Sequence, residues 1–215
     1  MTMKIAILTC GMLPLPAVQG GAVENLIDFY LDYNNRMKLH NITVYSPWNP
    51  KVTQHPALTS KVNHYHYIDV TSLKARIARR VYGYFHSHEY YNYFIEYYFE
   101  KVFASLNKKD YDYILLENCP GYAYKFFQRG YRNLILHLHN ELLHSKSRHH
   151  DEIFNSLKLG VCRNDNSGGF TVNDTDWGKS VKRQIIGNAE QRQSDQVNRS
   201  RSKGVAVVVC CKDVI

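Results

Sequence analysis

The chain has 215 residues, which is enough for one large or two small domains, and 44% of them are hydrophobic, which is enough for a sizeable core. Its formal net charge of +8 indicates an anionic partner, which is nucleic acid, a membrane surface or a phosphorylated substrate. The sequence has no nucleic-acid-binding motif, no secretory signal pattern at its N-terminus, and no apolar stretch near the ~20 residues that a membrane span needs.

The first part of the chain predicts a strand, a glycine-containing loop and a helix. Residues 4–10 form an apolar run of strand length, and residues 11–21 hold two prolines and the pair Gly20 and Gly21. Apolar residues then recur at helical spacing over residues 22–33. A unit of this kind favours anion binding, because loop amides and a helix N-terminus direct positive partial charge at one spot.

Two common nucleotide-binding motifs do not fit this unit. The NAD fingerprint needs G-x-G-x-x-G and an acidic residue after the next strand. Here the glycines are adjacent, and the next predicted strand, residues 41–45, is followed by Ser46-Pro47. A P-loop is also excluded, because the segment Gly178-Lys179-Ser180 has Asn173 where the motif requires its first glycine.

A basic amphipathic helix is predicted after the third strand, residues 62–70. Leu73, Ile77, Val81 and Tyr84 share one face of residues 73–85. This pattern fits either an interfacial helix on an anionic membrane or an ordinary surface helix with solvated cations. The candidate membrane contacts are Lys74, Arg76, Arg79 and Arg80.

The next helix, residues 89–106, is unusually aromatic, and we expect its rings to be packed in the core. The chain then alternates between strands at 111–118 and 133–141 and helices at 122–128 and 142–157. This alternation predicts an α/β fold of the Rossmann-like, three-layer type with a parallel sheet.

Several predicted strands end in polar residues. Ligands bind outside the carboxyl ends of the strands in parallel sheets, so these ends are expected to form one site. Period-two alternation places His137 and His139 on one face of their strand. The candidate ligand-binding residues at this edge are Gly20, Gly21, Glu117, Asn118, His137, His139, Asn140 and Glu141.

These features together resemble the N-terminal domain of GT-B glycosyltransferases, in particular the retaining family 4. That family opens with a strand, a proline-containing loop, a Gly-Gly pair with a nearby glutamate, a helix, and a strand of the type His-x-Val-Thr-Val. The matching residues are Pro14, Pro16, Gly20-Gly21, Glu24 and the segment His40-Asn41-Ile42-Thr43-Val44-Tyr45. The glutamate lies three residues after the second glycine, where the family usually has two. The resemblance covers residues 3–158.

The resemblance implies an activity and roles for single residues. Leu136-His137-Leu138-His139 is similar to the family's T-x-H segment, which makes His139 the candidate catalytic residue, hydrogen-bonded to a hydroxyl of the donor sugar. The Gly20-Gly21 amides would face the diphosphate or the acceptor, and Glu24 is a further candidate for substrate binding. The family transfers sugar from a UDP- or GDP-linked donor, with retention, to a glycan or lipid-linked acceptor, and cell-surface polysaccharide biosynthesis is the expected setting. No metal or other cofactor is implied.

The predicted domain covers residues 1–158 and regains a strand at 204–215, after a polar segment at 159–203 that we expect to be a long loop or disordered. The second, nucleotide-binding GT-B domain is absent from this sequence. The chain alone is therefore expected to have little or no transferase activity, and to need that domain or a partner subunit. The five cysteines lack C-x-x-C spacing and indicate reduced thiols, and so a cytoplasmic protein, peripheral at the inner face of the membrane if the basic helix binds there.

Other functions remain open on the sequence. A non-catalytic pseudo-transferase or scaffold subunit would share the sheet and the basic helix but tolerate loss of His139. A flavodoxin-like domain would bind a flavin or a nucleotide tightly. A metal site is disfavoured, because the histidine pairs at 64/66, 86/88, 137/139 and 149/150 never supply three ligands at a recognisable spacing.

Overall fold

The computed structural model describes residues 2–86, 93–107, 110–131, 133–138, 153, 157–161 and 207–211. The strands among these residues form one sheet with the order β3-β2-β1-β4-β5-β7-β6. The first five strands of that order are all parallel to one another, as predicted. Their bounds are Lys4–Leu8 (β1), Asn41–Pro47 (β2), Asn63–Ile68 (β3), Tyr113–Glu117 (β4) and Leu134–Leu138 (β5).

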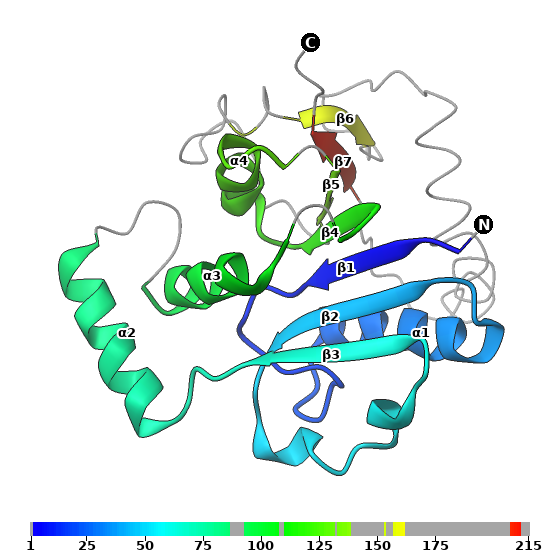
Figure 1. Cartoon of the computed structure of the whole chain (residues 1–215), viewed down its shortest axis with the longest axis horizontal. Coiled ribbons are helices and arrows are strands. Elements are labelled where there is room, and N and C mark those ends of the chain that lie inside the picture. Colours follow the sequence, from blue (N-terminus) through cyan, green and yellow to red (C-terminus); the bar gives the residue numbers. More distant parts are fainter. Residues whose placement is uncertain are drawn as a thin grey trace, which may run out of the picture.

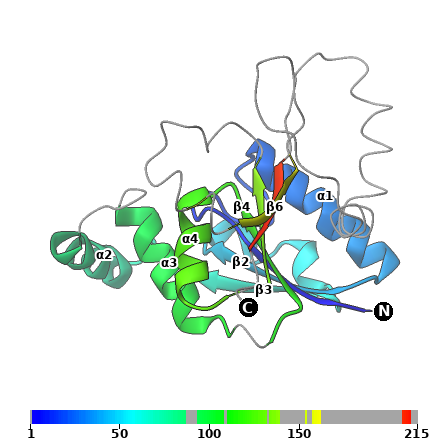
Figure 2. The same cartoon turned by 90° about the horizontal axis from the view of Figure 1, so that it is seen from above.

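Helices cover both faces of the sheet, so the fold is the Rossmann-like α/β type that the sequence predicts. Figure 2 shows α1 on one side of the sheet and α3 and α4 on the other. The helices are Ala22–Met37 (α1), Leu73–Phe85 (α2), Tyr93–Ser105 (α3) and Pro120–Gln128 (α4), with short 3₁₀ turns at Pro50–Val52 and Pro56–Thr59.

Local sequence explains where these helices begin and end. The hydroxyl of Ser72 accepts a hydrogen bond of 3.2 Å from the Ala75 amide and so caps α2. Pro120 occupies the first turn of α4, where its missing N–H removes no helical hydrogen bond. The helix α1 ends at Met37, and the next residue, Lys38, adopts a left-handed conformation and donates its N–H to the Asn34 carbonyl oxygen.

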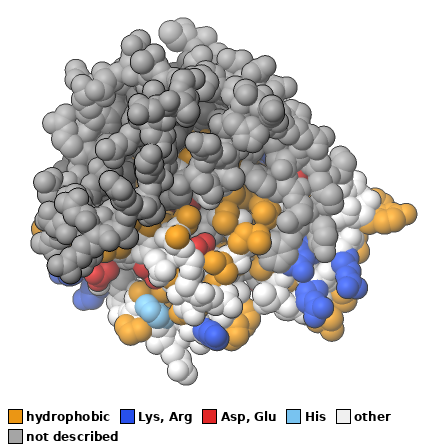
Figure 3. All heavy atoms as spheres, turned by 180° about the vertical axis from the view of Figure 1, so that it is seen from behind, with side chains coloured by type: hydrophobic (Ala, Val, Ile, Leu, Met, Phe, Trp, Pro, Cys, Tyr) orange, Lys and Arg blue, Asp and Glu red, His pale blue; other side chains and the backbone are white. Residues whose placement is uncertain are grey.

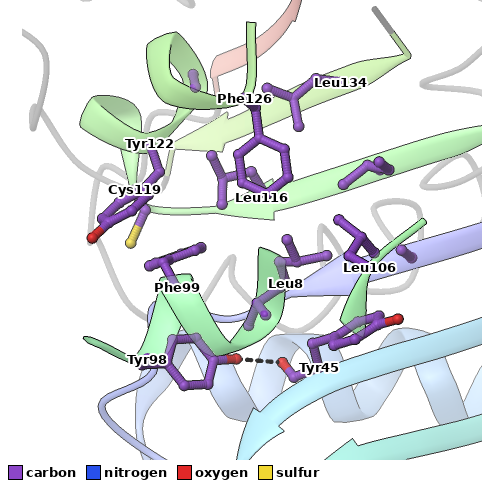
Figure 4. Packing of buried hydrophobic residues seen from close by; sticks show 14 of the residues in the cluster. Leu8, Tyr45, Tyr98, Phe99, Leu106, Leu116, Cys119, Tyr122, Phe126 and Leu134 are labelled. Carbon is purple, nitrogen blue, oxygen red and sulfur yellow. Dashed lines mark hydrogen bonds between the residues drawn. The ribbon is translucent and has the colours of Figure 1, made fainter. Parts of the chain in front are cut away.

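The core has two parts, one on each face of the sheet. On the α1 face, side chains such as Ile7, Ile27 and Leu31 pack together. The other face is aromatic: the ring of Phe99 stacks on that of Tyr122 at 3.8 Å, and both lie among aliphatic side chains of β1 and β4 (Figure 4). The described part of the aromatic helix therefore packs in the core, as expected.

Tyr98 joins α3 to the carboxyl end of the sheet. Its hydroxyl donates a hydrogen bond of 2.9 Å to the Tyr45 carbonyl oxygen and lies 3.4 Å from Oγ1 of Thr9. Its ring fills the space beside Gly11, where an added Cβ would overlap ring atoms. Gly11 also has φ +77°, so both the conformation and the close approach favour glycine here.

Two expectations for the C-terminal part are wrong in detail. The last residue of the helix predicted at 142–157, Leu157, is the first residue of the strand β6, Leu157–Val161. Of the other residues in that range, the structure describes only residue 153. The predicted last strand is present as β7, Val207–Cys211, but it is antiparallel to both β5 and β6. An apolar run indicates that a strand is buried, whereas its direction depends on how the preceding chain returns to the sheet.

Candidate functional site

The order of the parallel strands reverses between β1 and β4 (Figure 1). In open α/β sheets, ligands bind at such a switch point, outside the carboxyl ends of the strands. Two segments meet there: residues 9–21 after β1, here called the β1–α1 loop, and residues 117–119 at the end of β4. These segments contain most of the described residues that the sequence predicts to bind a ligand.

The β1–α1 loop is fixed by three other elements. The Leu15 amide donates to the Ser46 hydroxyl at 2.7 Å, and the Leu15 carbonyl oxygen accepts from the Tyr67 hydroxyl at 2.8 Å. The Ala17 amide donates to Oδ2 of Asp28 in α1 at 2.7 Å. These bonds tie the loop to β2, β3 and α1.

Gly21, Gly20 and Glu24 form the entrance to α1. Gly21 lies directly before the helix at φ +104°, and a Cβ added there would overlap Oε2 of Glu24 and Cδ1 of Leu13. The buried carboxylate of Glu24 therefore lies against the N-terminal end of its own helix. Gly20 has φ +78°, but a Cβ there would meet no atom of the described residues within 4 Å, so among these residues this side of the loop is open.

A buried contact between a histidine and a glutamate lies at the end of β4 and β5. Glu117 and His137 are direct neighbours in the parallel register, and Nδ1 of His137 lies 3.1 Å from Oε2 of Glu117. Both side chains are buried. Alternation along the strands puts them on the same face as Leu115 and Ile135, which is the face that α1 covers. The pair thus lies on the same edge and the same face as the Gly20-Gly21 turn.

Asn118 directs the chain from β4 into α4. It has a left-handed conformation, φ +58°, which asparagine tolerates better than most residues. Its N–H donates to the carbonyl oxygen of His137 at 2.8 Å, which extends the β4–β5 pairing by one bond. Cys119 follows at the start of α4.

Two cysteines meet across the switch point, which the sequence does not predict. A hydrogen bond from the Cys119 side chain favours the thiolate of Cys10 and is the largest cause that lowers the pKa of Cys10 to about 7. Burial opposes this shift, as does the negative charge of Glu24. The sequence signal for this contact is the position of the two cysteines, because each lies two residues after the end of a strand.

The candidate catalytic residue His139 lies outside the described residues, as do the predicted binding residues Asn140 and Glu141. The described candidates are Gly20, Gly21, Glu24, Glu117, Asn118 and His137. The structure brings all of them to the carboxyl edge of the sheet.

Among the described residues, no group of three or more His, Cys, Asp or Glu side chains could hold a metal ion. His66 instead packs its ring against that of Tyr45, with 4.9 Å between centroids. In the same part of the chain, no helix is long and apolar enough to cross a membrane.

The four predicted membrane contacts fall into two groups on α2. Lys74, Arg76 and Arg80 are exposed. Arg79 is partly buried, and its Nη1 donates a hydrogen bond of 3.0 Å to the Val70 carbonyl oxygen. Arg79 therefore helps to attach α2 to the domain.

Comparison of the chain with protein-family models, with curated proteins and with solved structures finds no match.

Proposed function

We propose that this chain is the N-terminal, acceptor-side part of a retaining GT-B glycosyltransferase. The observation that carries the proposal is the arrangement of Gly20, Gly21 and Glu24 at the switch point of a Rossmann-like sheet. A loop tied to neighbouring elements, with an open side and a fixed carboxylate, suits a ligand with several hydroxyl groups. It also agrees with the sequence resemblance to that family.

The position of Glu24 favours acceptor hydroxyls over a diphosphate at this loop. A free helix N-terminus attracts anions, because its amides carry positive partial charge. Here a buried carboxylate lies against that end of α1 and offsets the positive potential. A carboxylate accepts hydrogen bonds from sugar hydroxyls but repels phosphate. We therefore propose that the loop binds the sugar of a glycan or lipid-linked acceptor.

The donor, a UDP- or GDP-linked sugar, would be held mainly by a second domain or by a partner subunit. Cationic side chains and helix N-termini of that unit would stabilise the leaving diphosphate, with no metal or further cofactor required. In this proposal the enzyme acts in cell-surface polysaccharide biosynthesis at the cytoplasmic side of the membrane. The 215-residue chain by itself would transfer sugar at negligible rates.

The proposal is tested by saturation-transfer NMR of the whole chain with a panel of methyl glycosides. We expect at least one glycoside to bind, and Glu24→Gln to weaken its binding about tenfold or more, because one charged hydrogen-bond acceptor is lost. Asp32→Asn is the matched control, since Asp32 lies two turns further along α1 and is exposed. Binding of no glycoside, or equal binding by both variants, would contradict the proposal.

A second candidate is a non-catalytic scaffold that supports a separate catalytic partner. The burial of both Glu117 and His137 favours it, because a hydrogen-bonded pair removed from solvent has the features of a structural contact. Replacing His139 by alanine in the assembly with the nucleotide-binding partner separates the two functions. Full activity of that variant would support the scaffold, and loss of activity with normal assembly would support the transferase.

A further inference from the structure

The helix α2 contacts the rest of the protein through the side that carries Ala75, Arg79 and Tyr82. Ala75 is buried, Arg79 is hydrogen-bonded to Val70, and the ring of Tyr82 makes an edge contact with the ring of Tyr97 in α3 at 6.0 Å. At 3.6 residues per turn, positions 75, 79 and 82 lie on one side of the helix. This side is the one that faces the domain.

The apolar stripe of α2 lies on the opposite side and faces solvent. The exposed fraction of its residues lies between 52% and 85%. The stripe consists of Leu73, Ile77, Val81, Tyr84 and Phe85. An amphipathic helix of a globular protein normally turns its apolar stripe toward the core. In α2 the orientation is reversed, so burial within this domain does not account for the stripe.

Exposed cations border the stripe on both sides. By helical geometry, Arg76 and Arg80 lie along one border and Lys74 along the other. Figure 3 shows Lys and Arg side chains beside apolar ones at the end of the molecule that α2 occupies. Apolar side chains flanked by cations are typical of helices that lie in the interface of an anionic membrane.

We propose that α2 lies on the surface of an anionic lipid bilayer, with its apolar stripe inserted among the acyl chains. Lys74, Arg76 and Arg80 would then contact lipid phosphates. The same charges disfavour a second copy of the chain as the occupant, because two such helices face to face would bring six cations together. Arg79 is hydrogen-bonded to the domain and takes no part.

The location of α2 determines how the protein would be oriented on the membrane. Figures 1 and 2 show α2 at one end of the molecule, beyond the carboxyl ends of β1, β2 and β3. This is the end that carries the β1–α1 loop. Membrane binding would therefore turn the candidate site toward the lipid surface. The inference rests on the exposed stripe and its cations, and holds whether or not the chain belongs to a transferase.

The test is flotation of the whole 215-residue chain with two kinds of vesicle, one of phosphatidylcholine alone and one of phosphatidylcholine and phosphatidylglycerol in equal parts. We expect flotation with the anionic vesicles only, and its loss at high salt. Because each basic residue near such a surface contributes about fivefold in binding, Arg76→Gln with Arg80→Gln should weaken binding about thirtyfold. Ile77→Ser with Phe85→Ser should reduce it at least tenfold.

Matched controls change the same chemistry elsewhere on the surface. Lys51→Gln with Lys61→Gln removes two exposed cations outside α2, and Met37→Ser removes an exposed apolar side chain of α1. These variants should float as the unchanged chain does, and circular dichroism should show that all variants are folded. The proposal is wrong if the chain does not float with anionic vesicles, or if control and α2 variants lose binding equally. It is also wrong if size exclusion shows a dimer that Ile77→Ser with Phe85→Ser dissociates while vesicles are not bound.

Discussion

The imidazole of His137 and the carboxylate of Glu117 form a buried pair at the carboxyl edge of the sheet, with 3.1 Å between Nδ1 and Oε2. The two residues are twenty positions apart in the sequence and are brought together by the parallel register of β4 and β5. The pair therefore joins the ends of β4 and β5 at the edge where the candidate site lies.

Glu117→Ala should lower the free energy of unfolding by about 3–5 kcal/mol, because one partner of a buried pair is lost. Glu117→Gln keeps an oxygen that accepts the hydrogen bond from Nδ1 of His137, and should cost roughly 1 kcal/mol. Urea denaturation followed by circular dichroism measures both values. Similar values for the two variants would show that the oxygen that accepts the hydrogen bond from His137 adds little to stability.

Cys10 should react with iodoacetamide at a lower pH than an ordinary thiol. Its hydrogen bond from Cys119 lowers the pKa of Cys10 to about 7, so half of this thiol is ionised near neutral pH. Alkylation at each cysteine, followed against pH by peptide mass spectrometry, gives the midpoint for Cys10. Cys119→Ala should move that midpoint upward. An unchanged midpoint in this variant would show that Cys119 does not stabilise the thiolate.

The same thiol makes stability depend on pH in a defined direction. Because the pKa of Cys10 is lower in the folded chain than in the unfolded chain, the unfolded state binds more protons between about pH 7 and the ordinary thiol value of about 8.5. The free energy of unfolding should therefore rise with pH over this window. In Cys10→Ala this rise should be absent, as measured by urea denaturation at a series of pH values.

Gly20→Ala and Gly21→Ala form a matched pair of substitutions in the β1–α1 loop. Both residues have positive φ, which costs an alanine about 1–2 kcal/mol. At Gly21 the new Cβ would also overlap Glu24 and Leu13, which adds roughly 1–3 kcal/mol. Thermal unfolding should therefore show a clearly larger loss for Gly21→Ala. An equal loss would mean that Glu24 moves away without cost.

The buried tyrosines predict loss of stability at alkaline pH. Burial raises the pKa of Tyr45, Tyr98 and Tyr122 in the folded chain. Above about pH 10 the unfolded chain has lost these phenolic protons while the folded chain keeps them, so the free energy of unfolding falls as pH rises. Urea denaturation between about pH 9 and about pH 11 measures this fall. Tyr98→Phe should reduce its slope, whereas Tyr84→Phe, which removes an exposed ring, should not.

Sequence patterns predict the elements of the parallel part of the sheet because those elements depend on local properties. The apolar run of β1, the proline-containing loop and the helical spacing of α1 each restrict the backbone through nearby residues. The sequence also places Glu117 and His137 at the carboxyl ends of their strands, and these ends lie at one edge of the sheet because parallel strands all end on the same side.

The tertiary structure alone decides which residues of that edge contact one another. The pairing of Glu117 with His137, and of Cys10 with Cys119, depends on the order and register of β1, β4 and β5. Strand order is set by long-range packing, so residue types and spacing leave it open. For the same reason, the apolar run at residues 204–210 predicts a strand but not its antiparallel direction.

The helix α2 shows the same division most clearly. Its periodicity determines that Leu73, Ile77, Val81 and Tyr84 share one face, because 3.6 residues per turn is a property of the backbone. Which face meets the domain depends on the partner that α3 offers. In the folded protein α3 receives the side of α2 that carries Ala75, so the apolar stripe remains exposed.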